Sequence, residues 1–351
     1  MTAVESSSSR ILAVDLNSTA HQWRLGAQRA DVIRRSAPAG WRVRVVSAPT
    51  ISDGDGGAPP SEEALDAIRD AEVYLGFGIS RPLFLAAKQL KWVHSGAAGV
   101  GGALFPEMQE SDVVLTNSAG VHAVPIAEHV LAGVLHLLRG LDLALEQQRE
   151  RKWWREPFVD SSSPVRELRD CHALIVGSGG IGGAIATRLT ALGVLCSGIR
   201  RRPELGAPDG FTEVAGPDAL DSLLPHADLL ILAAPATHDT REMIMAARLN
   251  LLPPGAIVVN IARGSLLDER ALAERIEQGK LRGAVLDVFQ EEPLPASSSL
   301  WRMRQVVVTP HVSPVSPHGF WPRALDLFLT NWRRYAAGQP LLNVVDKAAG
   351  Y

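Results

Sequence analysis

Residues 173–182 read Ala-Leu-Ile-Val-Gly-Ser-Gly-Gly-Ile-Gly, and residues 184–189, Ala-Ile-Ala-Thr-Arg-Leu, follow them as a helix-forming stretch. The apolar run is typical of a buried strand, so the glycines stand where a strand turns into a helix. In this setting the first glycine suits the tight turn, the second lets the backbone approach a pyrophosphate, and the third allows close helix packing. The pattern predicts a dinucleotide site, with a plain strand-to-helix turn as the alternative. The residues expected to bind the cofactor here are Gly177, Gly179, Gly180, Ile181 and Gly182.

Further short apolar runs follow along the chain and alternate with helical segments. They lie at residues 195–199, 229–232, 256–259 and 306–308. Near-continuous apolar strands separated by helices indicate a doubly wound parallel sheet that is covered on both faces.

The first hundred residues also alternate between strand and helix patterns. Strands are expected at 10–14, 41–46, 72–76 and 91–94, a loop at 51–60, and a helix capped by Ser61. A helix at 323–332 is expected to cross back to this part of the chain. We therefore predict an α/β protein of two Rossmann-like domains: a discontinuous one, 10–117 plus 319–351, and an inserted dinucleotide-binding domain, 118–318, after a disordered tail at 1–9.

Composition narrows the class of protein. The chain has 351 residues, 46% of them hydrophobic, and a net charge of −3, so it offers no electrostatic case for nucleic acid. Only two cysteines occur and no metal-ligand spacing appears, which favours a reducing compartment and no metal site. The N-terminus lacks the apolar core of a signal peptide, and residues 121–145 are too polar for a membrane span. We expect a soluble, cytoplasmic protein that binds no membrane.

The region 118–150 predicts a long helix, capped by Asn117 and Ser118, with Pro125 near its beginning. Its apolar residues form two stripes, so the helix should be buried on more than one side. Packing between the two domains is one explanation. A homodimer interface through this region is the one we favour.

The end of the strand at 195–199 is where a dinucleotide enzyme contacts the adenosine ribose. An acidic residue there accepts hydrogen bonds from a 2′-hydroxyl, whereas this chain has Arg200 and Arg201, followed by Arg202. A guanidinium can bind a 2′-phosphate in bidentate fashion. The sequence therefore predicts a preference for NADP(H), with NAD(H) possible; a solvated basic turn is the alternative.

Three phrases near the C-terminal end carry a cation, a carboxylate and an imidazole. They are Asn-Ile-Ala-Arg-Gly at 260–264, Leu-Asp-Val-Phe-Gln-Glu-Glu-Pro-Leu at 286–294 and Val-Thr-Pro-His at 308–311. Reduction of a 2-oxo acid needs these groups: the cation holds the substrate carboxylate, the imidazole protonates the carbonyl oxygen, and the carboxylate keeps that imidazole charged.

With the glycine loop, residues 235–241 and Ala-Glu-His at 127–129, these phrases resemble the D-isomer-specific 2-hydroxyacid dehydrogenase family, and in particular its glyoxylate/hydroxypyruvate reductase-like branch. The resemblance implies a D-2-hydroxyacid dehydrogenase or 2-oxoacid reductase whose catalytic residues are Arg263, Glu292 and His311. It implies that the discontinuous domain binds substrate through Ala98, Gly99 and Val100. Arg263 and His311 of the inserted domain are expected to bind the substrate as well. Asp287 would hold the nicotinamide carboxamide, or would otherwise act as a cap. The further cofactor residues expected from it are Ala234, Pro235, Thr240, Ile261, Ala262, Arg263, His311 and Ser313.

Some features of the chain leave alternatives open. The family usually has Asp where this chain has Gly101, which puts the substrate in doubt. Trp153 and Trp154 are packing or interface residues, or line a neighbouring subunit's pocket. A formate dehydrogenase is disfavoured by Glu292, and a phosphoglycerate dehydrogenase by the arginine turn. A non-enzymatic, dinucleotide-sensing corepressor on the same fold remains possible.

Overall fold

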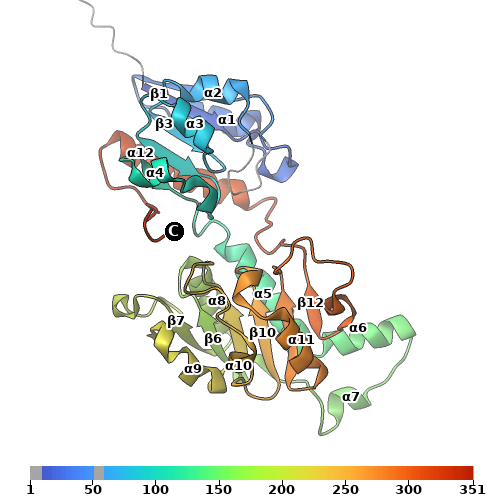
Figure 1. Ribbon diagram of the computed structural model, residues 1–351. Helices are drawn as coiled ribbons and strands as arrows, with labels where there is room; N and C mark the ends of the chain where they lie inside the picture. The colour runs from blue at the N-terminus through green and yellow to red at the C-terminus, as the bar shows by residue number, and fades with distance from the viewer. Residues whose placement is uncertain (1–9, 51–58, 351) are drawn as a thin grey trace, which may run out of the picture. The chain divides into compact units, whose positions relative to one another are not determined.

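The computed structural model describes residues 10–50 and 59–350 and divides into two compact units (Figure 1). One unit contains the chain up to Val121 and again from Ser316, and the other comprises His122–Val315. Each unit is built on a parallel sheet, which confirms the predicted α/β class. The tail predicted at 1–9 and most of the loop predicted at 51–60 lie outside the described residues.

The discontinuous unit has a five-stranded sheet in the order β2-β1-β3-β4-β5, with every pair parallel. Its strands are β1 (Arg10–Asp15), β2 (Trp41–Val45), β3 (Val73–Gly76), β4 (Trp92–Ser95) and β5 (Val114–Thr116). Its helices are α1 (Gly26–Arg35), α2 (Glu62–Ile68), α3 (Arg81–Ala86), α4 (Pro106–Glu110) and α12 (Phe320–Ala336). The four predicted strands are all present, and Ser61 caps α2 by accepting a hydrogen bond from Ala64 N.

The C-terminal helix α12 belongs to this first unit, as predicted. With α1 it covers one face of the sheet, where Leu12 and Val14 of β1 are buried, while α2, α3 and α4 cover the other. The ring of Trp92 stacks on Phe328 and Trp332 of α12. Large aromatic side chains bury much apolar area, so the sheet is incomplete without this returning helix.

The inserted unit has a seven-stranded parallel sheet in the order β12-β11-β10-β9-β6-β7-β8. Its strands are β6 (His172–Val176), β7 (Leu195–Ile199), β8 (Glu213–Ala215), β9 (Leu229–Leu232), β10 (Ala256–Asn260), β11 (Leu281–Leu286) and β12 (Val306–Val308). Its helices are α5 (Ala123–Leu138), α6 (Leu141–Glu150), α7 (Glu156–Val159), α8 (Gly180–Ala191), α9 (Leu220–Leu223), α10 (Ala246–Leu249) and α11 (Glu269–Glu277). Alternate strand residues point to opposite faces: α5 and α8 cover one, and α9, α10 and α11 the other (Figure 1). The doubly wound sheet was predicted correctly.

The predicted long helix is broken into two. Gly140, with φ of 66°, ends α5 and starts α6, which turns away by 66°. The apolar residues of α5 pack on the unit's own sheet and on α8, so this unit itself accounts for most of the burial. Leu141, expected to continue an apolar stripe, is instead 48% exposed because it lies beyond the break. A buried ion pair between Asp142 and Arg282 of β11 fastens the start of α6 to the sheet.

The predicted cap of the long helix is wrong. His122 occupies the N-cap position of α5 and no side chain caps it. Asn117 and Ser118 instead donate hydrogen bonds to the carbonyl oxygens of Ala98 (2.8 Å) and Ser95 (2.9 Å). Short polar side chains satisfy whichever backbone groups lie nearest, and here these belong to the loop after β4.

Within the described residues, no single helix is both long and apolar enough to cross a membrane. Only α5 and α6 taken together, across their bend, reach that length and composition.

A charged cluster joins the first strand to the last helix in the discontinuous unit. Glu72, 7% exposed, accepts hydrogen bonds from the guanidinium of Arg10 at 2.8 and 2.6 Å and from the hydroxyl of Tyr335 at 2.7 Å. The Arg10 hydrogen bonds are the main cause that lowers the pKa of Glu72 to about 2. The ionised carboxylate therefore stabilises the folded unit at pH values above the ordinary pKa of a glutamate.

We expect this stabilisation to disappear as the pH falls from about 4.5 towards 2, since the folded-state pKa lies below the unfolded one. Glu72→Gln should lower the free energy of unfolding near neutral pH by on the order of 3 kcal/mol and flatten its dependence on pH in this window. Urea unfolding, followed by tryptophan fluorescence between pH 2 and 7, measures this. The exposed substitution Glu110→Gln is the control, and equal behaviour of the two variants would contradict the assignment.

Candidate active site

The predicted cofactor and catalytic residues of the inserted unit all follow the carboxyl ends of neighbouring strands. Val176 of β6 pairs with Ile199 of β7, and Leu232 of β9 pairs with both Val176 and Asn260 of β10. The next strands are in register at the same ends: Asn260 pairs with Leu286, and Leu286 pairs with Val308. The strand order is that of an open, doubly wound sheet. In such sheets ligands bind beyond the carboxyl ends of the strands.

The glycine loop has the geometry that a pyrophosphate requires. Gly177 has φ of 102°, and a Cβ there would lie 2.5 Å from Ala234 N, so the turn tolerates no side chain. A Cβ on Gly182 would lie 2.1 Å from Gly177 O, because α8 packs directly against the strand end. Gly179 is exposed and nothing lies within 4 Å of the position of its missing Cβ. With no side-chain cap on α8, its first N–H groups face outward, and these residues fit a dinucleotide.

Arg200 emerges beside this loop. Gly177 N donates to Ile199 O, the last residue of β7, at 2.9 Å. The Arg200 side chain is half-buried, and its Nη1 donates to Gly206 O at 2.9 Å. Arg201 and Arg202 are exposed. A fixed guanidinium next to the glycine loop is suited to a phosphate on the adenosine ribose.

The loop after β9 is closed by a threonine. The hydroxyl of Thr240 donates to Pro235 O at 2.6 Å and accepts a hydrogen bond from Thr237 N at 2.8 Å. Ala234 is buried against Gly177, whereas Pro235 is exposed at the sheet edge.

Two features fix the backbone around Arg263. Asn260, fully buried at the end of β10, donates to Arg263 O at 3.0 Å and accepts from Ala262 N at 3.1 Å. A Cβ on Gly264 would lie 1.9 Å from the carbonyl carbon of Phe289, so this loop lies directly on the loop after β11. Ile261 and Ala262 are buried, and the Arg263 side chain is exposed. The arrangement holds the backbone. The guanidinium donates from Nη1 to Ala262 O at 2.8 Å and has further N–H groups that can bind an anion.

Glu292 and His311 form a hydrogen-bonded pair. His311 Nδ1 lies 2.9 Å from Glu292 Oε2, and the side chains are 44% and 36% exposed. Glu292 Oε1 accepts from Phe289 N at 3.0 Å, which leaves Oε2 for the histidine. An ionised carboxylate can only accept, so His311 carries a proton on Nδ1, and its Nε2 makes no hydrogen bond within the described part of the chain.

The Asp287 carboxylate is fully buried and organises the loop after β12. It accepts hydrogen bonds from Thr309 Oγ1 at 2.5 Å and from the backbone N–H groups of Val312 and Ser313, both at 2.9 Å. These bonds are those of the capping alternative, and contact with a nicotinamide carboxamide stays a prediction. Ser313 is itself buried.

The loop predicted to bind substrate lies in the other unit, after β4. The backbone N–H groups of Ala98, Gly99 and Val100 make no hydrogen bond to any of the described residues. Asn117 holds the loop through Ala98 O, Gly99 is exposed and Val100 is buried. Successive unpaired N–H groups in a fixed loop can bind a carboxylate.

Comparison with known proteins agrees with this geometry. Residues 131–313 match the model of the D-isomer specific 2-hydroxyacid dehydrogenase, NAD binding domain. The chain belongs to the D-isomer specific 2-hydroxyacid dehydrogenase family. As a member of this family it is an NAD(P)-dependent oxidoreductase, which confirms the family and the class of enzyme inferred from sequence.

Individual relatives cover most of the chain. The (S)-sulfolactate dehydrogenase of Chromohalobacter salexigens is 32% identical over 68% of this chain and 75% of its own. Glyoxylate/hydroxypyruvate reductase A of Salmonella newport is 31% identical over 76% of this chain and 84% of its own. A D-isomer specific 2-hydroxyacid dehydrogenase from Xanthobacter autotrophicus Py2, solved with NADPH and MES, has a TM-score of 0.76 and 29% identity over 98% of this chain and all of its own.

Gly101, where the sequence analysis expected the family's Asp, follows the predicted substrate loop. The residue starts a short 3-10 helix, Gly101–Ala103, with a backbone that does not need glycine, and nothing lies within 4 Å of the position of a Cβ. The N–H groups of Ala103 and Leu104 close the turn. The backbone at Gly101 would therefore accept a side chain without a change in the turn.

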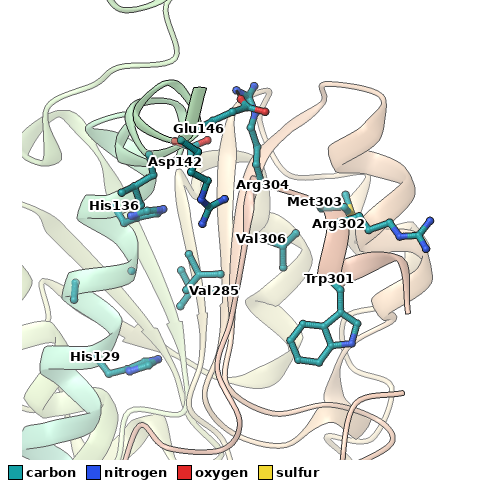
Figure 2. Close-up of a pocket in the computed structure, with 15 residues that line it drawn as sticks. His129, His136, Asp142, Glu146, Val285, Trp301, Arg302, Met303, Arg304 and Val306 are labelled. Atoms are coloured by element: carbon teal, nitrogen blue, oxygen red, sulfur yellow. Dashed lines mark hydrogen bonds and ion pairs between the residues drawn. The ribbon is translucent and has the colours of Figure 1, made fainter. Parts of the chain in front are cut away.

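A cavity of about 590 Å³ lies elsewhere in the inserted unit, between α5, α6 and the segment around β12 (Figure 2). In Figure 2 the side chains of His129 and Trp301 stand on the two sides of Val285 and Val306. Arg263, Glu292 and His311 do not line this cavity. Beyond α6, Trp153 is 94% exposed and Trp154 is 53% exposed.

The sequence reading missed residues that hold the dehydrogenase's loops. Three of them lie within the sequence stretches 260–264, 286–294 and 308–311, although no role was predicted for them: Asn260, Gln290 and Thr309. Gln290 N donates to Glu269 and its side chain donates to Leu267 O. One signal was present: a polar residue directly after an apolar strand, such as Asn260, commonly bonds to the turn that follows it.

Proposed function

We propose that this dehydrogenase uses NADPH to reduce a 2-oxo acid, of glyoxylate or hydroxypyruvate type or larger, to the D-2-hydroxy acid. The observation that carries the proposal is the 2.9 Å pair of His311 and Glu292, next to the loop of Arg263 that Gly264 fastens in place. Relatives named glyoxylate/hydroxypyruvate reductase support the substrate class. A neighbour solved with NADPH supports the cofactor.

Each residue has a defined part in the reaction. The Arg263 guanidinium binds the substrate carboxylate and stabilises charge on the carbonyl oxygen. His311, held on Nδ1 by Glu292, donates the proton on Nε2 to that oxygen. The N–H groups of Ala98, Gly99 and Val100 bind the carboxylate from the backbone. When bound at the glycine loop, the nicotinamide cofactor supplies the hydride that adds to C2.

We expect purified protein to oxidise NADPH with at least one of glyoxylate, hydroxypyruvate and phenylpyruvate. His311→Ala should lower kcat about 10²- to 10⁴-fold, as loss of a general acid does, while NADPH binding measured by fluorescence stays within about twofold. His226→Ala is the matched control, because this exposed histidine precedes β9 and so lies at the opposite edge of the sheet. Near-normal turnover by His311→Ala would rule out the proposed acid.

Arg200 should set the choice between the cofactors. Arg200→Asp replaces a phosphate ligand with a repelling charge, so we expect the ratio of kcat/KM for NADPH to that for NADH to fall about 10- to 100-fold. Arg202→Asp makes the same charge change two residues away on an exposed side chain. If both variants reduce the ratio equally, residues 200–202 act only through their combined positive charge, and Arg200 makes no specific contact with the phosphate.

We also propose that the protein is a homodimer, with the segment from α6 through α7 at the interface. Five large apolar side chains are exposed along this segment. They are Leu141, Leu145, Trp153, Trp154 and Val159. Exposed apolar side chains gathered on one segment mark an interaction surface, and a second copy of this chain can cover it by presenting the same segment.

Changing Trp153 and Trp154 together to Ser should shift the protein from dimer to monomer at micromolar concentration, because aromatic side chains dominate such interfaces. Light scattering after size-exclusion chromatography gives the mass. Leu192→Ser, an equally apolar exposed site on the end of α8, should leave the mass unchanged. A wild-type protein that is already monomeric would refute the proposal.

A further inference from the structure

The backbone at His311 is in an unusual conformation. Its φ is 53°, in the left-handed region that residues with a Cβ seldom adopt. Such a conformation costs on its own and persists only where neighbouring contacts enforce it. The contacts come mainly from Asp287: its carbonyl oxygen accepts from His311 N at 2.9 Å, and its carboxylate accepts from the next two backbone N–H groups. The placement of the imidazole thus depends on where the Asp287 carboxylate lies.

A third donor to that carboxylate is the hydroxyl of Thr309, at 2.5 Å. A threonine hydroxyl has one proton, and because the carboxylate only accepts, that proton points to Asp287. The hydroxyl oxygen is then an acceptor for its second neighbour, Nε2 of His129, at 3.2 Å. His129 must therefore carry a proton on Nε2.

These hydrogen bonds form a chain that starts on a helix and ends at the loop after β12. His129 lies on α5, whose apolar side chains are buried on the sheet, so its backbone is well fixed. From there the bonds run through Thr309 to Asp287, and from Asp287 to the backbone N–H groups of His311 and of the two residues that follow it. Within the described part of the structure, no hydrogen bond joins a member of this chain to Arg263 or to the glycine loop.

We infer that Thr309 and His129 are positioning residues, which hold the Asp287 carboxylate and with it the backbone that presents His311 to Glu292. The inference rests on the proposed function for its effect on turnover, because it takes His311 to be the acid. Its effect on the order of the loop is independent of that assumption. The glycine loop and Arg200, which follow β6 and β7, lie at other strand ends, so binding of the phosphate-bearing part of NADPH there should change little.

The first test is kinetic. Thr309→Val keeps the shape of the side chain but removes the hydroxyl, so we expect kcat for the preferred oxo acid to fall about tenfold while KM for NADPH changes less than twofold. Thr309→Ser restores the hydroxyl and should return kcat to within about threefold of wild type. His129→Ala should impair kcat in the same way, by about threefold, and His129→Gln, which retains a donor, should recover it.

The control is His136→Ala. This half-buried histidine lies on the same helix and lines the same cavity, and it makes no hydrogen bond with any of the described residues. It should leave kcat, KM and the melting temperature unchanged. An equal loss in His136→Ala and His129→Ala would assign the effect to α5 packing and overturn the inference.

The second test needs no turnover. Hydrogen exchange read by mass spectrometry should show the amides of Val312 and Ser313 exchanging about tenfold faster in Thr309→Val than in wild type or Thr309→Ser, with the strands of the sheet unchanged. Faster exchange throughout the unit, or none in this loop, would overturn the inference. If the wild-type protein reduces no oxo acid, the proposed function fails, and the exchange result still decides whether Thr309 holds the loop.

Discussion

The parallel, in-register pairing of the seven-stranded sheet is the constraint on which the site of the inserted unit depends. Because all strands run the same way, each loop after a strand starts at the same edge. The strands β12 and β6 are four strand spacings apart, roughly 19 Å. His311 therefore lies far from Gly177 along one edge, a span that a small acid cannot bridge but an extended dinucleotide can.

Glycines at this edge set how closely the loops approach each other. At Gly264 and Gly182 the backbone conformation is open to any residue, and what excludes a side chain is another backbone within 1.9 to 2.1 Å of the position of a Cβ. At Gly177 both the positive φ and the neighbouring chain exclude one. At this edge, glycine is thus needed more often because another backbone lies close than because of its conformational freedom. The loops therefore pack directly on one another.

Most of the inserted unit could be predicted because buried parallel strands have a distinctive sequence, as at Leu229–Leu232, which the structure reproduces residue for residue. The same reasoning failed where a local pattern had two possible partners. Asn117 and Ser118 have the composition of a helix cap, but the loop after β4 lies nearer to them. The break at Gly140 was hidden because one glycine inside an apolar run is compatible with a continuous helix. The hydrogen-bond chain of His129, Thr309 and Asp287 joins residues whose sequence separation gives no signal.

The functional side chains and the groups that hold them are divided between solvent and core. Arg263 and His311 are exposed, as side chains proposed to meet a substrate must be. Asn260, which ends β10, and Asp287, which follows β11, are fully buried. Burying an amide or a carboxylate is unfavourable unless its hydrogen bonds are satisfied, and both are satisfied by the loop that carries the functional residue. Any displacement of the loop breaks those bonds inside the core. The buried polar residue at the end of each of these two strands therefore holds the backbone of a loop, while the exposed side chain on that loop stays open to a ligand.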